Sequence, residues 1–107
     1  MFGIMEVDIP GLEKIRRESP VVLVDVRTEA EVAHGGIDGA AHIPLYLLPL
    51  KADELCKQTP TVFYCQSGAR SAQACVFLTS RGFDNVFNLQ GGMMAWLRAG
   101  QPLGAVA

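Results

Sequence analysis

The sequence has 107 residues, of which 50% are hydrophobic and 19% are charged, and its formal net charge is −2. This length and composition predict one globular domain over residues 1–107 with a single apolar core. The nine basic and eleven acidic residues form no runs, which argues against nucleic acid or a membrane surface as a partner. No stretch resembles a signal peptide or approaches the roughly twenty apolar residues that cross a bilayer. We therefore expect a cytoplasmic protein.

The elements expected in chain order alternate between helices and strands. Asp8 followed by Pro10 predicts the start of a short helix. The β-branched run 21–26 predicts a strand buried on both faces, and the spacing of Thr28 and Glu31 predicts a capping box and a helix directly after it. A strand over 61–65, a helix over 71–81, a strand over 85–89 and a helix over 93–99 follow. This alternation indicates a parallel α/β sheet.

The three cysteines, Cys56, Cys65 and Cys75, are an odd number and include no C-x-x-C pair. Neither a disulfide framework nor a zinc site is therefore expected. His34 and His42 have no thiol beside them, and zinc usually requires three or four clustered ligands. We expect free thiols and no metal.

Cys65 stands where the strand over 61–65 ends and a short loop leads to the next helix. Ligands of parallel α/β folds bind outside the carboxyl ends of the strands, and a helix N-terminus offers free N–H groups and about half a positive charge. A cysteine that faces such a terminus has a lowered pKa and is a nucleophile at neutral pH. Gly68 permits a tight turn that aims N–H groups inward, and Arg70 adds a permanent charge suited to an oxyanion.

These residues also have ordinary structural interpretations. A free cysteine is commonly a small buried hydrophobe, and we adopt this interpretation for Cys56 and Cys75 because neither stands at a junction between strand and helix. Arg70 fits an exposed surface side chain as well, and Ser71 fits the N-cap of the helix that follows. For Cys65, its position, the glycine and the arginine together favour chemistry.

Four motifs in this order resemble the rhodanese domain, a sulfurtransferase fold in which a cysteine persulfide carries sulfane sulfur. They are Leu23–Arg27 with Glu29 and Glu31, Gly36–Pro44, Cys65–Ser71 and Asn88–Trp96. The resemblance spans almost the whole chain. It implies a rhodanese-like three-layer α/β/α fold with a five-stranded parallel sheet, with Cys65 as the persulfide carrier and no cofactor beyond that covalent intermediate.

The function that the resemblance implies is that of a thiosulfate:cyanide sulfurtransferase. Cys65 would take sulfur from thiosulfate or a low-molecular-weight persulfide and pass it to a thiol, to a protein of a sulfur relay, or to cyanide in an assay.

Arg70 would orient an anionic donor, and Asp25 and Arg27 would hold neighbouring loops together by charge-assisted hydrogen bonds. The loop N–H groups would stabilise the terminal sulfur. The residues expected to bind substrate are Gln66, Ser67, Gly68, Ala69, Arg70 and Ser71. Gly91, Gly92 and Trp96 are expected to serve packing and helix entry.

Two departures from the family pattern stand out. Many members have histidine at the position of Gly36, which we expect to touch only a turn. Many also have arginine at the position of Gln66, so this loop carries one arginine rather than two and should attract a dianion such as thiosulfate less strongly.

Two other functions remain open from the sequence. Rhodanese-like modules also serve as binding or regulatory domains without catalysis, although the presence of Cys65 argues against that. Tyrosine phosphatases and arsenate reductases also combine a low-pKa cysteine with an arginine, but in a Cys-x5-Arg loop, whereas Cys65 and Arg70 are separated by four residues. The shorter loop suits a single sulfur atom better than a tetrahedral phosphate.

Overall fold

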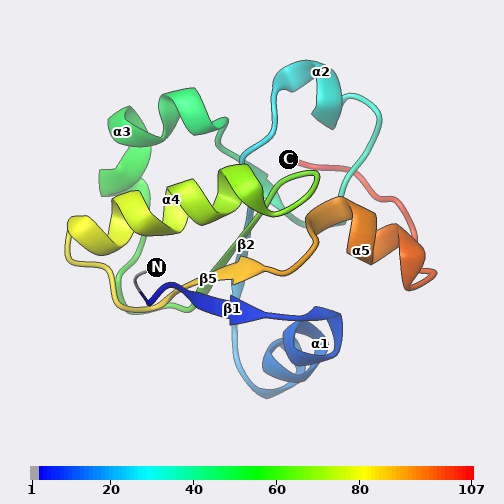
Figure 1. The fold of residues 1–107 in the computed structure, drawn as a ribbon, viewed down its shortest axis with the longest axis horizontal. Coiled ribbons are helices and arrows are strands. Elements are labelled where there is room, and N and C mark those ends of the chain that lie inside the picture. Colours follow the sequence, from blue (N-terminus) through cyan, green and yellow to red (C-terminus); the bar gives the residue numbers. More distant parts are fainter. Residues whose placement is uncertain (1–2) are drawn as a thin grey trace.

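The computed structural model describes residues 3–107, which form a five-stranded sheet of order β1-β5-β4-β2-β3 (Figure 1). Every neighbouring pair of strands is parallel. The strands are β1 (Met5–Val7), β2 (Val22–Asp25), β3 (Ala41–His42), β4 (Thr61–Tyr64) and β5 (Val86–Leu89). The helices are α1 (Ile9–Glu18), α2 (Glu29–Val32), α3 (Leu48–Lys51), α4 (Ala69–Ser80) and α5 (Gly92–Arg98), with 3-10 turns η1 (Leu45–Leu47) and η2 (Ala52–Glu54). The expected five-stranded parallel α/β sheet is confirmed.

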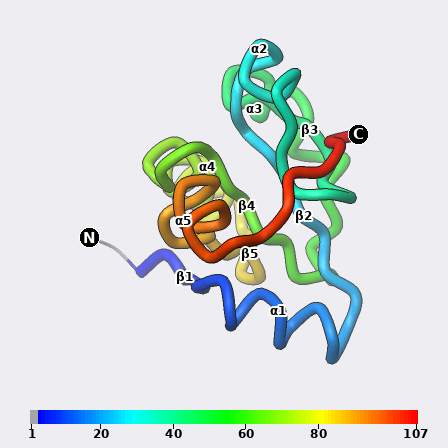
Figure 2. The backbone as a smooth tube through the Cα atoms, turned by 90° about the vertical axis from the view of Figure 1, so that its right-hand side faces the viewer, coloured from blue at the N-terminus to red at the C-terminus, as the bar shows by residue number. Residues whose placement is uncertain are grey.

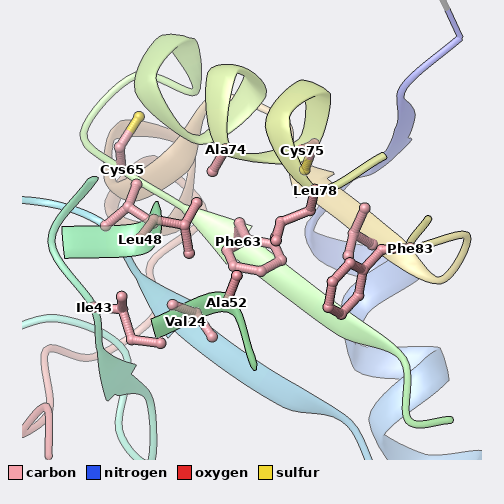
Figure 3. Close-up of a cluster of buried hydrophobic side chains, with 12 residues drawn as sticks. Val24, Ile43, Leu48, Ala52, Phe63, Cys65, Ala74, Cys75, Leu78 and Phe83 are labelled. Atoms are coloured by element: carbon pink, nitrogen blue, oxygen red, sulfur yellow. The ribbon is translucent and has the colours of Figure 1, made fainter. Parts of the chain in front are cut away.

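Both faces of the sheet are buried under packed side chains. Successive residues of a strand point to opposite sides, so each strand contributes to both faces. On one face, Phe63 of β4 packs with residues of α3 and α4, including Leu48 and Leu78 (Figure 3). On the other face, Val62 packs with residues of α1 and α5. The central strand β4 is buried at all four positions, which explains why its sequence is a continuous apolar run rather than an alternating one.

Local sequence signals fix the starts of the first two helices. The Asp8 carboxylate accepts a hydrogen bond from the Gly11 N–H at 2.8 Å, which makes Asp8 the N-cap of α1 as expected. At α2, the Thr28 side chain accepts from the Glu31 N–H, and the Glu31 carboxylate accepts from the Thr28 N–H. The predicted capping box is therefore present, and it fixes the position of the Glu31 side chain.

A buried ion pair anchors the end of β2. Arg27 donates to the Asp25 carboxylate from Nε at 3.0 Å and from Nη2 at 2.7 Å, and its Nη2 also donates to the Gly35 carbonyl at 2.8 Å. Burial by itself lowers the pKa of Arg27, but the hydrogen bond and charge of Asp25 outweigh it and raise that pKa above its ordinary value. The pair joins the end of β2 to the loop that leads toward β3.

Gly36 lies against this buried cluster. A Cβ atom at Gly36 would stand 2.8 Å from both Arg27 Nη2 and the Tyr64 hydroxyl. Gly36 also pairs with Gly104 of the C-terminal segment, which runs back past β3 (Figure 2). The expectation that Gly36 touches only a turn is therefore wrong, because its missing side chain leaves room for the guanidinium of Arg27.

Among residues 3–107, no helix combines the length and the apolar character needed to cross a bilayer.

Candidate active site

Cys65 directly follows β4, at the carboxyl end of a central strand of the parallel sheet. The residue is fully buried. Its sulfur points away from the apolar side chains of β4 and toward the start of α4 (Figure 3). The thiol therefore faces the N-terminus of a helix, where the backbone N–H groups lack partners within the helix.

The loop turns at Gly68, whose φ of +104° lies in the left-handed region that glycine adopts without strain. This turn makes Gly68 the N-cap of α4, and the helix begins at Ala69. The expectation that Ser71 is the N-cap is therefore wrong, because Ser71 lies in the first turn and is buried. The Gly68 N–H donates to Cys65 Sγ at 3.1 Å, and the Ser71 N–H donates to the same sulfur at 3.4 Å.

These donors determine how readily Cys65 ionises. Burial by itself raises the pKa of the thiol, but hydrogen bonds from the Ser71 hydroxyl and from the N–H groups of Ser71, Gly68 and Ser67 outweigh it. The pKa of Cys65 is consequently below its ordinary value. Cys75, which is also fully buried, shows the opposite result, because burial raises its pKa to about 12. Cys65 is therefore the buried cysteine suited to act as a nucleophile.

Cys56 is exposed, so its interpretation as a buried hydrophobe is wrong. It follows η2 in a turn where its sulfur accepts a hydrogen bond from the Gln58 N–H at 3.4 Å. This bond lowers the pKa of Cys56, with a smaller contribution from the Thr59 hydroxyl. Cys56 lacks the helix N-terminus that Cys65 faces.

Asn88 of β5 braces the loop from the neighbouring strand. It is buried, its Oδ1 accepts from the Ser71 hydroxyl at 2.5 Å, and its Nδ2 donates to the Gly68 carbonyl at 3.2 Å. The Ser71 oxygen also lies 3.4 Å from Cys65 Sγ. Because a hydroxyl has one proton, the Ser71 hydroxyl can donate either to Asn88 or to the sulfur. Ionisation of Cys65 to the thiolate favours donation to the sulfur. We did not predict this role, although a polar residue near the end of an apolar strand was a signal for it.

The start of α5 closes the other side of the loop. The Met93 N–H donates to the Cys65 carbonyl at 2.9 Å, and the Met94 N–H donates to the Gln66 carbonyl at 3.0 Å. A Cβ atom at Gly92 would stand 2.3 Å from the Cys65 carbonyl oxygen. Gly92 therefore does more than begin a helix, because its lack of a side chain lets α5 dock on the backbone of the loop.

Arg70 does not stand free beside the sulfur. Its Nη1 donates to Glu31 Oε1 at 2.7 Å and its Nη2 donates to Glu31 Oε2 at 2.8 Å, in a bidentate pair between α4 and α2. Hydrogen bonding to Arg70 lowers the pKa of Glu31 to about 2. The same bond raises the pKa of Arg70, and the negative charge of Cys65 adds to that rise. The capping box and the family motif include Glu31 but do not predict this pair, since residues 39 apart carry no sign of being paired.

The other predicted residues occupy two kinds of position. Gln66, Ser67 and Ala69 are exposed at the surface of the loop. The Arg27 guanidinium bonds to the Asp25 carboxylate and to the Gly35 carbonyl, and it makes no hydrogen bond to Cys65 Sγ. In the part of the chain that the structure describes, no group of three or more His, Cys, Asp and Glu side chains is placed to hold a metal ion.

Comparison with known proteins identifies the family. The model of the rhodanese-like domain matches residues 10–99. The chain belongs to the rhodanese-like family. It is 43% identical over 99 residues to a protein named sulfurtransferase from Allochromatium vinosum, with 92% of each chain covered.

Solved structures agree with this assignment. A rhodanese-related protein from Thermoplasma volcanium has a TM-score of 0.84 at 27% identity, covering 92% of this chain and 96% of the other. A rhodanese-like domain protein from Staphylococcus aureus has a TM-score of 0.80 at 35% identity, covering 87% and 91%. The rhodanese-like fold expected from the motifs is therefore confirmed.

The Ser71→Ala variant tests the hydrogen bond that the hydroxyl offers to the sulfur. Its removal should raise the pKa of Cys65 and slow the reaction of the thiol with iodoacetamide at pH 7 by about tenfold, since hydrogen bonds to charged groups contribute roughly 1.5–3 kcal/mol. The rate of Cys65 alkylation against pH, followed by peptide mass spectrometry, measures both effects. An unchanged pH profile would contradict a role for this hydroxyl.

The Gly92→Ala variant tests the contact between α5 and the loop. Gly39→Ala is the matched control, because Gly39 also has positive φ, at +86°, but a Cβ there meets nothing within 4 Å. We expect Gly92→Ala to lower the free energy of unfolding by at least about 2 kcal/mol more than Gly39→Ala, because its Cβ would collide with the Cys65 carbonyl. Urea unfolding measures the difference. Equal losses in the two variants would show that the close approach is unimportant.

Proposed function

We propose that the protein is a sulfurtransferase that carries sulfane sulfur as a persulfide on Cys65, from thiosulfate or a low-molecular-weight persulfide to a thiol acceptor. The observation that carries the proposal is the pair of N–H groups, of Gly68 and Ser71, that donate to Cys65 Sγ at 3.1 and 3.4 Å at the start of α4. Membership of the rhodanese-like family and the similarity to a protein named sulfurtransferase support it.

The first half of the proposed reaction loads the enzyme. The Cys65 thiolate attacks the outer sulfur of thiosulfate, and a new S–S bond forms while the bond between the two sulfur atoms of thiosulfate breaks. Sulfite leaves with the electron pair of the broken bond, and the enzyme holds Cys65–S–S⁻. A lowered pKa favours this step because the thiolate, and not the thiol, is the nucleophile.

The second half of the reaction unloads the enzyme. An acceptor thiolate, or cyanide in an assay, attacks the outer sulfur of the persulfide, and Cys65 leaves again as a thiolate. A covalent intermediate of this kind divides one transfer into two easier steps. The loop from Gln66 to Ser71 would stabilise the charged outer sulfur with its N–H groups, as an oxyanion is stabilised in acyl transfer.

The length of the loop supports sulfur transfer over phosphate chemistry. Four residues separate Cys65 from Arg70, one fewer than in the Cys-x5-Arg loop of tyrosine phosphatases. The shorter loop suits a single sulfur atom better than a tetrahedral phosphate. The proposal requires no cofactor. It places the reaction in the cytoplasm, with a small-molecule donor and either a small thiol or a protein of a sulfur relay as acceptor.

Intact-mass spectrometry tests the proposal. The reduced protein is incubated with thiosulfate and, separately, with glutathione persulfide. We expect a gain of one sulfur atom that dithiothreitol removes and that Cys65→Ala abolishes. Cys56→Ala and Cys75→Ala are the matched controls and should load normally, because neither thiol faces the start of α4. Loss of loading in Cys56→Ala or Cys75→Ala, or no loading of the wild type by either donor, would overturn the proposal.

A further inference from the structure

Arg70 is the sole cationic residue of the segment from Gln66 to Ser71, and its charge is already paired. The two terminal nitrogens of its guanidinium meet the two carboxylate oxygens of Glu31, at 2.7 and 2.8 Å. This pair occupies the edge of the guanidinium formed by its two terminal nitrogens, which would otherwise bind a sulfonate or phosphate in the same bidentate way. An anionic donor that reaches the loop therefore meets a neutral ion pair rather than a free cation.

Glu31 is held in place independently of Arg70. The Thr28 N–H donates to Glu31 Oε1 at 3.0 Å, and the Thr28 hydroxyl donates to the same oxygen at 3.1 Å. The carboxylate is thus fixed by the start of its own helix. With its pKa lowered to about 2, Glu31 stays ionised at neutral pH. The pair consequently differs from the mobile ion pairs between long side chains on protein surfaces.

The charged side chains next to this pair in α2 and at the end of β2 add no free cation. Glu29, in the same turn of α2, is exposed and accepts a hydrogen bond from the Tyr46 hydroxyl at 2.7 Å. The buried cation at the end of β2, Arg27, is paired with Asp25. When Cys65 is ionised, Cys65, Arg70 and Glu31 together carry a net negative charge. Thiosulfate, which has two negative charges, is repelled by such a site, whereas a hydropersulfide presents at most one charge at its reacting end.

We propose that Glu31 is a specificity-determining residue: by pairing with Arg70, it disfavours dianionic donors such as thiosulfate and favours hydropersulfides of small thiols. The inference rests on the proposed function, since it concerns which donor loads Cys65. It assigns Glu31 a role in donor choice in addition to its role as a helix cap. The wild-type protein should accordingly show a higher kcat/KM with a small hydropersulfide than with thiosulfate.

The decisive variant is Glu31→Gln, which removes the negative charge and preserves the cap, because Gln serves at this position of a capping box as well as Glu. We expect kcat/KM for thiosulfate to rise by about fivefold, mainly through a lower KM, as the freed guanidinium attracts the dianion. The gain should shrink as ionic strength increases. With the hydropersulfide of 2-mercaptoethanol, whose charge is confined to its sulfur, kcat/KM should change by less than about twofold.

Two further variants show whether the gain acts through Arg70. Glu29→Gln removes a neighbouring negative charge that is not paired with Arg70, and it should leave the ratio of the two kcat/KM values within about twofold of wild type. The double variant Glu31→Gln/Arg70→Gln should lose the gain with thiosulfate.

The outcomes separate the two proposals. If both donors load Cys65 and Glu31→Gln leaves the donor ratio unchanged, the role of Glu31 is refuted and the sulfurtransferase function stands. An equal gain in Glu29→Gln, or a gain that persists in the double variant, would also refute the role of Glu31. If neither donor loads the wild-type protein, both proposals fail.

Discussion

The arrangement of the site depends on the backbone N–H groups that surround one sulfur atom. Cys65 is buried at the end of a central strand, where burial alone would keep its thiol neutral, and the donors of Gly68 and Ser71 reverse that effect. The parallel sheet is what makes this possible, because it places the end of β4 beside the start of α4. Cys75 illustrates the alternative, since it is equally buried on the same face of the sheet and burial raises its pKa.

The parts of the protein farther from the sulfur keep these donors in position. Asn88 holds the loop from β5, and α5 donates two N–H groups to the loop carbonyls across a contact that Gly92 permits. The two arginines are paired in different surroundings. Arg27 is buried with Asp25 and supports the fold, whereas Arg70 is partly exposed with Glu31 beside the site. The backbone therefore supplies the stabilisation of charge that arginines could otherwise provide.

Much of the fold was predictable from sequence because its signals are local. The capping residues Asp8 and Thr28 have their predicted roles, and the apolar run before Cys65 forms a strand. Strands β1 and β3, with three and two residues, are too short to show a periodic pattern, and only the family resemblance implied five strands. The start of α4 was misplaced because serine is a common N-cap, whereas here a left-handed glycine ends the loop.

The site was predictable to the extent that its chemistry lies in one segment. One short segment contains Cys65, Gly68 and Arg70, so their proximity was evident from the sequence. Three other elements contribute Glu31, Asn88 and Gly92 to the loop. The central claim is that this loop favours the thiolate of Cys65. Ultraviolet absorbance of the thiolate against pH, taken as the difference between wild type and Cys65→Ser, tests it directly. We predict a midpoint below that of an ordinary cysteine, and a midpoint at or above the ordinary value would contradict the account.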